Sequence, residues 1–87
     1  MHALVVRVAI EDPKAAMREL RERTVPRVSQ APGFVSGYWT RKDNTGLAMI
    51  IFESEDAARA AGERIQAEPP AEVNIEDAEL REVVAQA

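Results

Sequence analysis

Residues Ala3–Ile10 read ALVVRVAI, and this run constrains the fold more than any other part of the chain. Successive side chains of a strand point to opposite faces of its sheet. One face would carry four branched apolar side chains, Leu4, Val6, Val8 and Ile10. The other face is also apolar, apart from Arg7. A strand that is apolar on both faces is expected at the centre of a sheet, or in a sheet that is covered on both sides.

A helix is expected directly after this strand. Asp12 is a good N-cap, because its carboxylate accepts the free N–H groups of the first turn, and Pro13 suits the first helical position. The helix face that turns inward is marked by residues at helical spacing, Met17, Leu20, Thr24 and Val28. Pro26 should kink the last turns, and Ala31–Gly33 should end the helix.

Two further strands are expected to form a hairpin. The second strand is predicted over Phe34–Arg41 and the third over Leu47–Phe52. Alternation places Phe34 on the same face as Tyr38. Asp43–Gly46 is a strong turn signal, because Asn and Gly tolerate positive φ. The third strand, like the first, is apolar on both faces.

The last third of the chain adds a second helix and a last strand. Ser54 should cap the helix, and Pro69-Pro70 should end it. Its inner stripe consists of small or branched residues, Ala57, Ala61 and Ile65. Two strand-like pieces follow, Glu72–Ile75 and Ala78–Ala85, with a bulge or bend near Glu76-Asp77.

This order, β-α-β-β-α-β, predicts a single α+β domain over residues 1–87 with the ferredoxin-like arrangement. Right-handed crossovers place both helices on one face of an antiparallel sheet with strand order 4-1-3-2. The other face would then be apolar and bare. An exposed apolar face of this size marks an interface, so we expect a homodimer in which two sheets pack face to face.

Composition excludes several classes of function. The chain has no cysteine and one histidine, which argues against thiolate metal sites, iron–sulfur clusters and a histidine-rich metal site. Its formal net charge of −4, with only two lysines, argues against nucleic-acid binding. No apolar run is long enough to span a membrane. We therefore expect a cytoplasmic protein with no cofactor, no metal, no nucleic-acid partner and no membrane association; the Ala- and Arg-rich composition suggests a bacterial source.

The runs Ala31–Trp39 (APGFVSGYW) and Ile51–Ala58 (IFESEDAA) carry a resemblance. Together they resemble the dimeric α/β-barrel superfamily, and in particular its antibiotic-biosynthesis-monooxygenase-like branch, over essentially the whole chain. The resemblance implies a homodimer with a ligand cleft between each sheet and its helices. Members of this superfamily include cofactor-free oxygenases acting on polyketide hydroquinones, heme-degrading enzymes, isomerases and proteins with no known reaction.

Four side chains are candidates for catalysis, Arg7, Tyr38, Trp39 and Asn74. The resemblance implies that an aromatic residue here lines the cleft and that the tryptophan donates a hydrogen bond to a ring oxygen. Arg7 would anchor an anion or enolate, and Asn74 would orient the substrate. The cofactor-free oxygenases depend on these four residue types.

Each candidate also has a structural interpretation. The aromatic residues would fill the core or the dimer seam. Asn74 would be a polar break before the last strand. A buried guanidinium needs a partner, so Arg7 would pair with an acid, Glu53, Glu72 or Glu82, or reach solvent at a strand end. Heme-degrading relatives use an Asn on the first strand with a Trp and a His. This chain has Arg7 there and only His2, expected to be a solvated terminal residue, so heme binding is disfavoured.

Three functions follow, in decreasing order of support. The first is a cofactor-independent monooxygenase acting on an aromatic or quinol-type substrate, in which the protein supplies desolvation and a donor to the developing oxyanion. The second is a non-catalytic ligand-binding or assembly module on the same dimer, since the chain has no paired carboxylates and no nucleophile–base set. The third, RNA binding on an open sheet, needs exposed aromatic residues among basic ones and ranks last.

Overall fold

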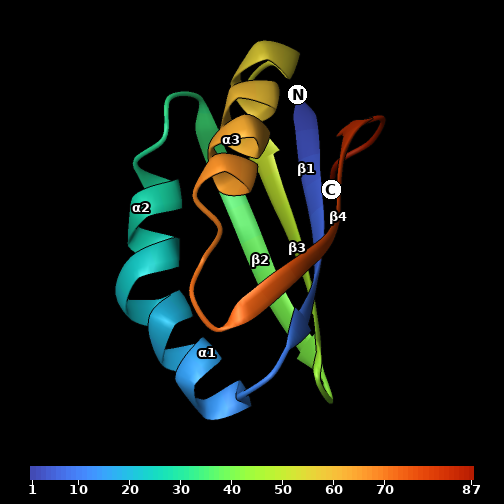
Figure 1. The fold of residues 1–87 in the computed structure, drawn as a ribbon. Coiled ribbons are helices and arrows are strands. Elements are labelled where there is room, and N and C mark those ends of the chain that lie inside the picture. Colours follow the sequence, from blue (N-terminus) through green and yellow to red (C-terminus); the bar gives the residue numbers. More distant parts are fainter.

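The computed structural model describes all of residues 1–87 and has the predicted order of elements (Figure 1). The π-helical turn between the first two helices is labelled η1. In chain order the elements are β1 (His2–Ile10), α1 (Pro13–Glu19), η1 (Leu20–Thr24), α2 (Val25–Ser29), β2 (Phe34–Lys42), β3 (Thr45–Phe52), α3 (Glu55–Ala67) and β4 (Val73–Glu82). None of the helices is both long enough and apolar enough to cross a bilayer.

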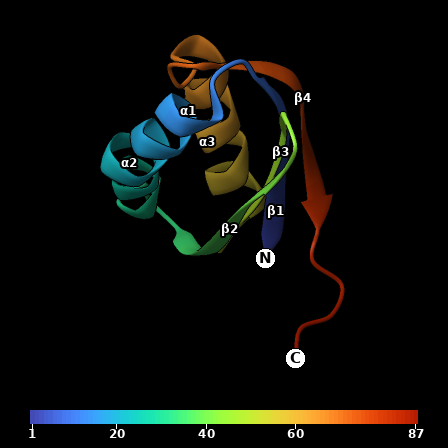
Figure 2. The ribbon, with the colours of Figure 1, turned by 90° about the horizontal axis from the view of Figure 1, so that it is seen from below.

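The four strands form one antiparallel sheet in the order β2-β3-β1-β4. This is the predicted order, and the two strands that are apolar on both faces, β1 and β3, are the central ones. The helices all lie on one side of the sheet and leave the other side bare (Figure 2). The ferredoxin-like fold is therefore confirmed.

The N-termini of α1 and α3 are capped by the two residues predicted from the sequence. Asp12 accepts hydrogen bonds from the backbone N–H groups of Lys14 and Ala15, at 3.1 and 3.2 Å. Ser54 accepts one from the N–H of Ala57 at 3.1 Å. These bonds satisfy N–H groups that have no partner within the helix.

The first helical segment contains a π-helical turn, η1, directly before Pro26. A proline has no N–H to offer the carbonyl four residues earlier, and its ring clashes with that carbonyl. The helical turn before Pro26 takes in one extra residue instead. The N–H of Val25 donates to the carbonyl of Leu20, five residues earlier in the chain. The predicted kink thus takes the form of a wider turn, which is a frequent feature of functional sites.

Strand β2 differs from its predicted alternation. The pairing with β3 shifts by one residue between Phe34 and Ser36, which is a β-bulge at Val35. Phe34 therefore lies on the helix side, where its ring meets that of Phe52 edge to face with centroids 6.3 Å apart. The prediction that Phe34 shares a face with Tyr38 is wrong. The extra residue at the bulge shifts the alternation, so the strand residues before the bulge point to the opposite face from the one expected.

Two smaller expectations also change. The turn between β2 and β3 is tighter than predicted, since β3 begins at Thr45, and the residue with positive φ is Asp43 (54°). Strand β4 is continuous from Val73 to Glu82 and ends earlier than predicted. The predicted irregularity is present as a register shift opposite Arg7 and Val8.

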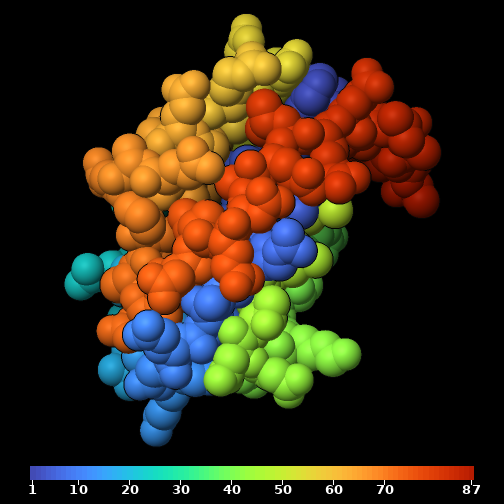
Figure 3. Space-filling model, turned by 45° about the vertical axis from the view of Figure 1, so that its right-hand side comes forward, coloured from blue at the N-terminus to red at the C-terminus, as the bar shows by residue number.

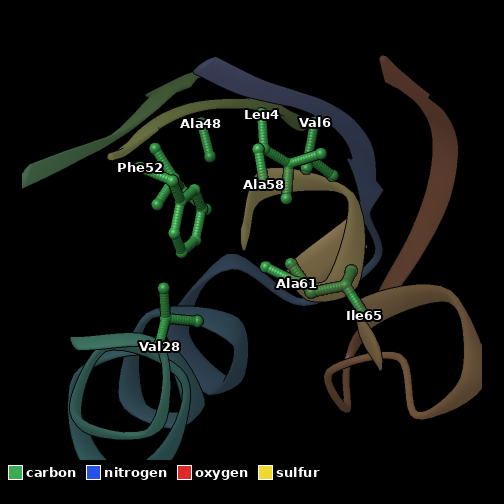
Figure 4. Packing of buried hydrophobic residues seen from close by; sticks show 9 residues of the cluster. Leu4, Val6, Val28, Ala48, Phe52, Ala58, Ala61 and Ile65 are labelled. Atoms are coloured by element: carbon green, nitrogen blue, oxygen red, sulfur yellow. The ribbon is translucent and has the colours of Figure 1, made fainter. Parts of the chain in front are cut away.

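The core lies between the sheet and the helices (Figure 4). Nine buried side chains form one cluster, drawn from β1, β3, α2 and α3: Leu4, Val6, Val28, Ala48, Ile50, Phe52, Ala58, Ala61 and Ile65. The alanines of α3 let that helix approach the sheet closely. Phe52 is fully buried and is the largest side chain of the cluster.

Candidate functional site

A cavity lies between the sheet and the first helical segment, beside the core cluster. Most of its lining is apolar and comes from all four strands and the helices, including Val6, Val8, Met17, Leu20 and Ile75. Its volume is about 80 Å³, roughly half of the ~150 Å³ of an apolar cavity that holds benzene. A single aromatic ring would therefore fill it and extend through its mouth.

Trp39 is the aromatic side chain of this cavity. It lies on the helix side of β2, opposite Ala48 of β3, and its indole N–H makes no hydrogen bond within the chain. The indole ring packs directly over Gly37, since a Cβ atom at Gly37 would come within 2.9 Å of two ring carbons. The glycine thus sets how the tryptophan lies against the sheet.

Thr24 is the second polar side chain of interest. It belongs to the π-helical turn, lines the cavity, and is only 7% exposed. Its hydroxyl takes part in none of the side-chain hydrogen bonds of the structure. The one side-chain polar atom that is both fully buried and unpartnered is Nδ1 of His2, so the Thr24 oxygen reaches the surface of the cavity. An apolar cavity with two free polar groups is the usual composition of a small-molecule site.

The other three predicted residues lie elsewhere. Tyr38 is on the bare side of β2, opposite Met49. Arg7 is exposed on the same side and pairs with Asp77 at 3.6 Å, with 55% and 49% of the two side chains exposed. The guanidinium is therefore not buried, and its partner is none of the three acids we considered. Of the four candidates, only Trp39 lines the cavity.

Asn74 also lies away from the cavity. Its neighbours Val73 and Ile75 both line the cavity, so the side chain between them points to the bare side. There the amide of Asn74 donates a hydrogen bond to the carboxylate of Glu11 at 3.3 Å. The catalytic roles of Arg7, Tyr38 and Asn74 stay predictions. Within one chain these residues do not share a cleft with Trp39.

The bare side of the sheet is apolar at its centre. We define this open face by the side chains Val5, Tyr38, Leu47, Met49 and Ile51, which occupy the central positions of β1, β2 and β3. Tyr38, Leu47 and Met49 are 70%, 47% and 45% exposed. Along the β4 edge the face is charged, with the pairs Arg7–Asp77 and Arg81–Glu79. Figure 3 shows β4 as the outermost strand, with β1 beside it.

The total exposed area of the chain is larger than expected for a monomer, as it would be if a partner covered this face. The chain exposes 5763 Å². A monomeric protein of 9.6 kDa is expected to expose about 5,100 Å². The excess, about 700 Å², approaches the ~800 Å² that one partner buries in a standard interface. The C-terminal residues 83–87, which extend beyond β4, also contribute to the excess exposed area (Figure 2).

The residues of the cavity do not fit a heme. Heme iron is held by His, Cys, Met or Tyr side chains, and the lining offers only Met17 among these. The one charged lining residue is the acid Glu19, which would repel heme carboxylates. His2 lies at the start of β1, outside the cavity; it is half-buried, with its Nδ1 atom unpartnered, rather than solvated as expected. No group of three or more acidic, histidine or cysteine side chains is placed to hold a metal ion.

Sequence reasoning missed Thr24 and Gly37 as parts of the site. Thr24 was assigned to the inner helix face as a core position, and nothing in the sequence marked its hydroxyl as unpartnered. A signal existed in Pro26, which lies two residues after Thr24. Its missing N–H predicts a disturbed helical turn in the residues that precede it. The spacing Gly37-x-Trp39 was a second signal, because residues two apart in a strand share a face.

Comparison with known proteins gives structural neighbours only. No family model and no curated protein matches the chain. One similar solved structure is the heme-degrader MhuD from Mycobacterium tuberculosis with two hemes bound in its active site, at 28% identity and TM-score 0.46, covering 97% of this chain and 98% of that one. Another is a mutant of MhuD with two manganese protoporphyrin IX bound per active site, at 27% identity and TM-score 0.49, covering 97% of each chain.

The element order and the strand order of this chain are those of the ferredoxin-like fold. Both neighbours hold a porphyrin in the active site. At TM-scores of 0.46 and 0.49 the superposition is loose, so the site of this chain rests on its own residues.

Proposed function

We propose that the chain binds a small aromatic molecule with an oxygen substituent in the cavity between sheet and helices, and acts on it as an oxygenase. The observation that carries this proposal is the pairing of an apolar cavity with two unpartnered polar groups, the Thr24 hydroxyl and the Trp39 indole N–H. The apolar walls favour a ring, and the two polar groups favour an oxygen on it.

The chemistry expected from these residues is desolvation and charge stabilisation. A quinol or anthrone-type ring gives up a proton readily, and the resulting carbanion can react with O₂. In the balanced reaction the C–H carbon para to a ring hydroxyl takes one oxygen atom of O₂ as a carbonyl. The hydroxyl becomes the second carbonyl of a quinone, and the other oxygen atom leaves as water with the two hydrogens released from the C–H and O–H groups. A donor such as the Trp39 N–H would stabilise the oxyanion that forms, and its effect is largest where water is excluded.

The test is oxygen uptake with a panel of dihydroxy-aromatic compounds and anthrones. We expect Trp39→Phe to lower the rate by about 10²-fold, which is typical of removing one oxyanion donor. The control is Arg59→Gln, because Arg59 lies on α3, pairs with Glu55 and lines neither of the two cavities described for this fold. Ring binding without oxygen uptake would favour the non-catalytic module. Absence of both would contradict the proposal.

The partner in this proposal is a second copy of the chain, bound through the open face. The apolar centre of that face and the excess exposed area support it. Its charged edge also supports it, because a twofold axis can bring the Arg7–Asp77 edge of one copy against the complementary charges of the other. Each copy would keep its own cavity, which lies on the opposite side of the sheet.

A hemin titration separates this chain from heme-degrading proteins. Because the cavity offers no histidine and no basic side chain, we expect no sharp shift of the Soret band at a ratio of one or two hemins per chain. Albumin, which binds hemin, serves as the positive control. A sharp stoichiometric shift that is lost in His2→Ala or Met17→Leu would show axial ligation and overturn the expectation.

A further inference from the structure

A second cavity adjoins the first, between α2 and α3. Its volume is about 190 Å³. The two cavities share four lining residues, Thr24, Val28, Ile65 and Pro70. Taken together, they are larger than the ~150 Å³ cavity that holds a benzene ring. The two cavities therefore lie next to each other and share a wall at these residues.

The second cavity has a larger share of polar and charged lining residues than the first and carries positive charge. Its charged lining residues are Arg27, Arg64 and Glu68, so their sum is 2 − 1 = +1. Arg27 pairs with Glu68 at 3.7 Å, and more than half of each side chain is exposed. Arg64 belongs to none of the ion pairs of the chain and is available for an anion. The first cavity, by contrast, has Glu19 as its one charged residue, and Glu19 is paired with Arg23.

Thr24 stands where the two cavities meet. Its side chain is 7% exposed and its hydroxyl has no partner in the chain, so the junction holds an unused hydrogen-bonding group. A hydroxyl can donate to a carboxylate oxygen or accept from a hydroxyl of the ligand. An apolar cavity, an unpartnered hydroxyl at the shared wall and a guanidinium outside any ion pair thus lie close to one another.

From this sequence of groups we infer that the ligand is a small aromatic carboxylic acid, with its ring in the first cavity and its carboxylate at Arg64, assisted by Arg27. The inference rests on the proposed function, because it names the substrate class of the same site. A guanidinium binds a carboxylate through two parallel hydrogen bonds, which fixes the orientation of the ring as well as its charge. An uncharged ring of the same size would lose this contact.

The test compares 2-naphthoate with the neutral 2-naphthamide. Trp39 is the single tryptophan of the chain and lines the first cavity, so its fluorescence reports binding. We expect the wild type to bind the acid about two- to fivefold more tightly than the amide, as one partly exposed charge pair provides. Arg64→Gln should remove most of this preference by weakening the binding of the acid. Arg59→Gln is the control on the same helix and should retain the preference.

The outcomes distinguish the two proposals. Equal affinity for acid and amide in the wild type, or an unchanged preference in Arg64→Gln, would overturn the assignment of a carboxylic acid and leave the proposed function standing. If neither compound changes the fluorescence of Trp39, both proposals fail. Thr24→Val should weaken both probes, because it removes the hydroxyl at the junction while keeping the shape of the side chain.

Discussion

Replacing Met49 with arginine is expected to dissociate the proposed homodimer. Met49 lies at the centre of the open face, between Tyr38 of β2 and Val5 of β1. In a face-to-face dimer a guanidinium at this position would be buried without a partner, which is costly. Central interface positions contribute about 2–4 kcal/mol, which corresponds to an increase of about 30- to 1,000-fold in the dimer dissociation constant.

Sedimentation equilibrium of wild type and Met49→Arg measures this change directly. The matched control is Gln66→Arg, which adds the same charge on the outer side of α3, where Gln66 is exposed. Circular dichroism checks that each variant is folded, and 45% exposure of Met49 in the single chain indicates that arginine is tolerated there. A monomeric wild type at micromolar concentration, or a dimer that persists in Met49→Arg, would contradict the proposed interface.

Phe52→Ala is expected to lower the free energy of unfolding by several kcal/mol. Phe52 is 0% exposed and packs edge to face against Phe34. Replacing a buried phenylalanine by alanine costs about 3–5 kcal/mol, because the transfer free energy is lost and a cavity remains. A chain of 87 residues has a free energy of unfolding of about 4–13 kcal/mol. The substitution therefore removes a third or more of the stability over most of this range.

Urea unfolding, followed by circular dichroism at one fixed protein concentration, measures the loss. Fixed concentration matters because dimerisation stabilises the folded chain by mass action. Phe52→Leu is the matched variant, since it keeps an apolar side chain and should cost much less than Phe52→Ala. Equal losses for the two variants, or a loss below about 1 kcal/mol for Phe52→Ala, would show that this ring is not central to the core.

The elements of the fold were predictable because their signals are local. Asp12 and Ser54 cap their helices through bonds to residues two or three positions away, so a short stretch of sequence suffices to find them. The central positions of β1 and β3 followed from apolar side chains on both faces. The bulge at Val35 was not predictable, because it depends on how β2 pairs with β3 and no residue type marks it.

The candidate site was predictable only in part. The choice of Trp39 placed one correct residue in the cavity. Arg7, Tyr38 and Asn74 lie on the other side of the sheet, because the face of a strand residue is fixed by register and by bulges rather than by its chemistry. Arg7 also illustrates a limit of burial arguments, since its strand is central while its side chain reaches solvent beside Asp77.

Taken alone, the sequence determined the number, order and type of the elements, the identity of the central strands and the apolar character of both sheet faces. These properties follow from periodicity, capping and turn chemistry over a few residues. Only the tertiary structure decided which polar groups meet. The wall shared by the two cavities is built from residues of η1, α2 and α3, with Thr24 among them. Arg27 of α2 and Arg64 of α3 line the same cavity. Such contacts join residues about 40 positions apart, and their geometry depends on how whole elements pack.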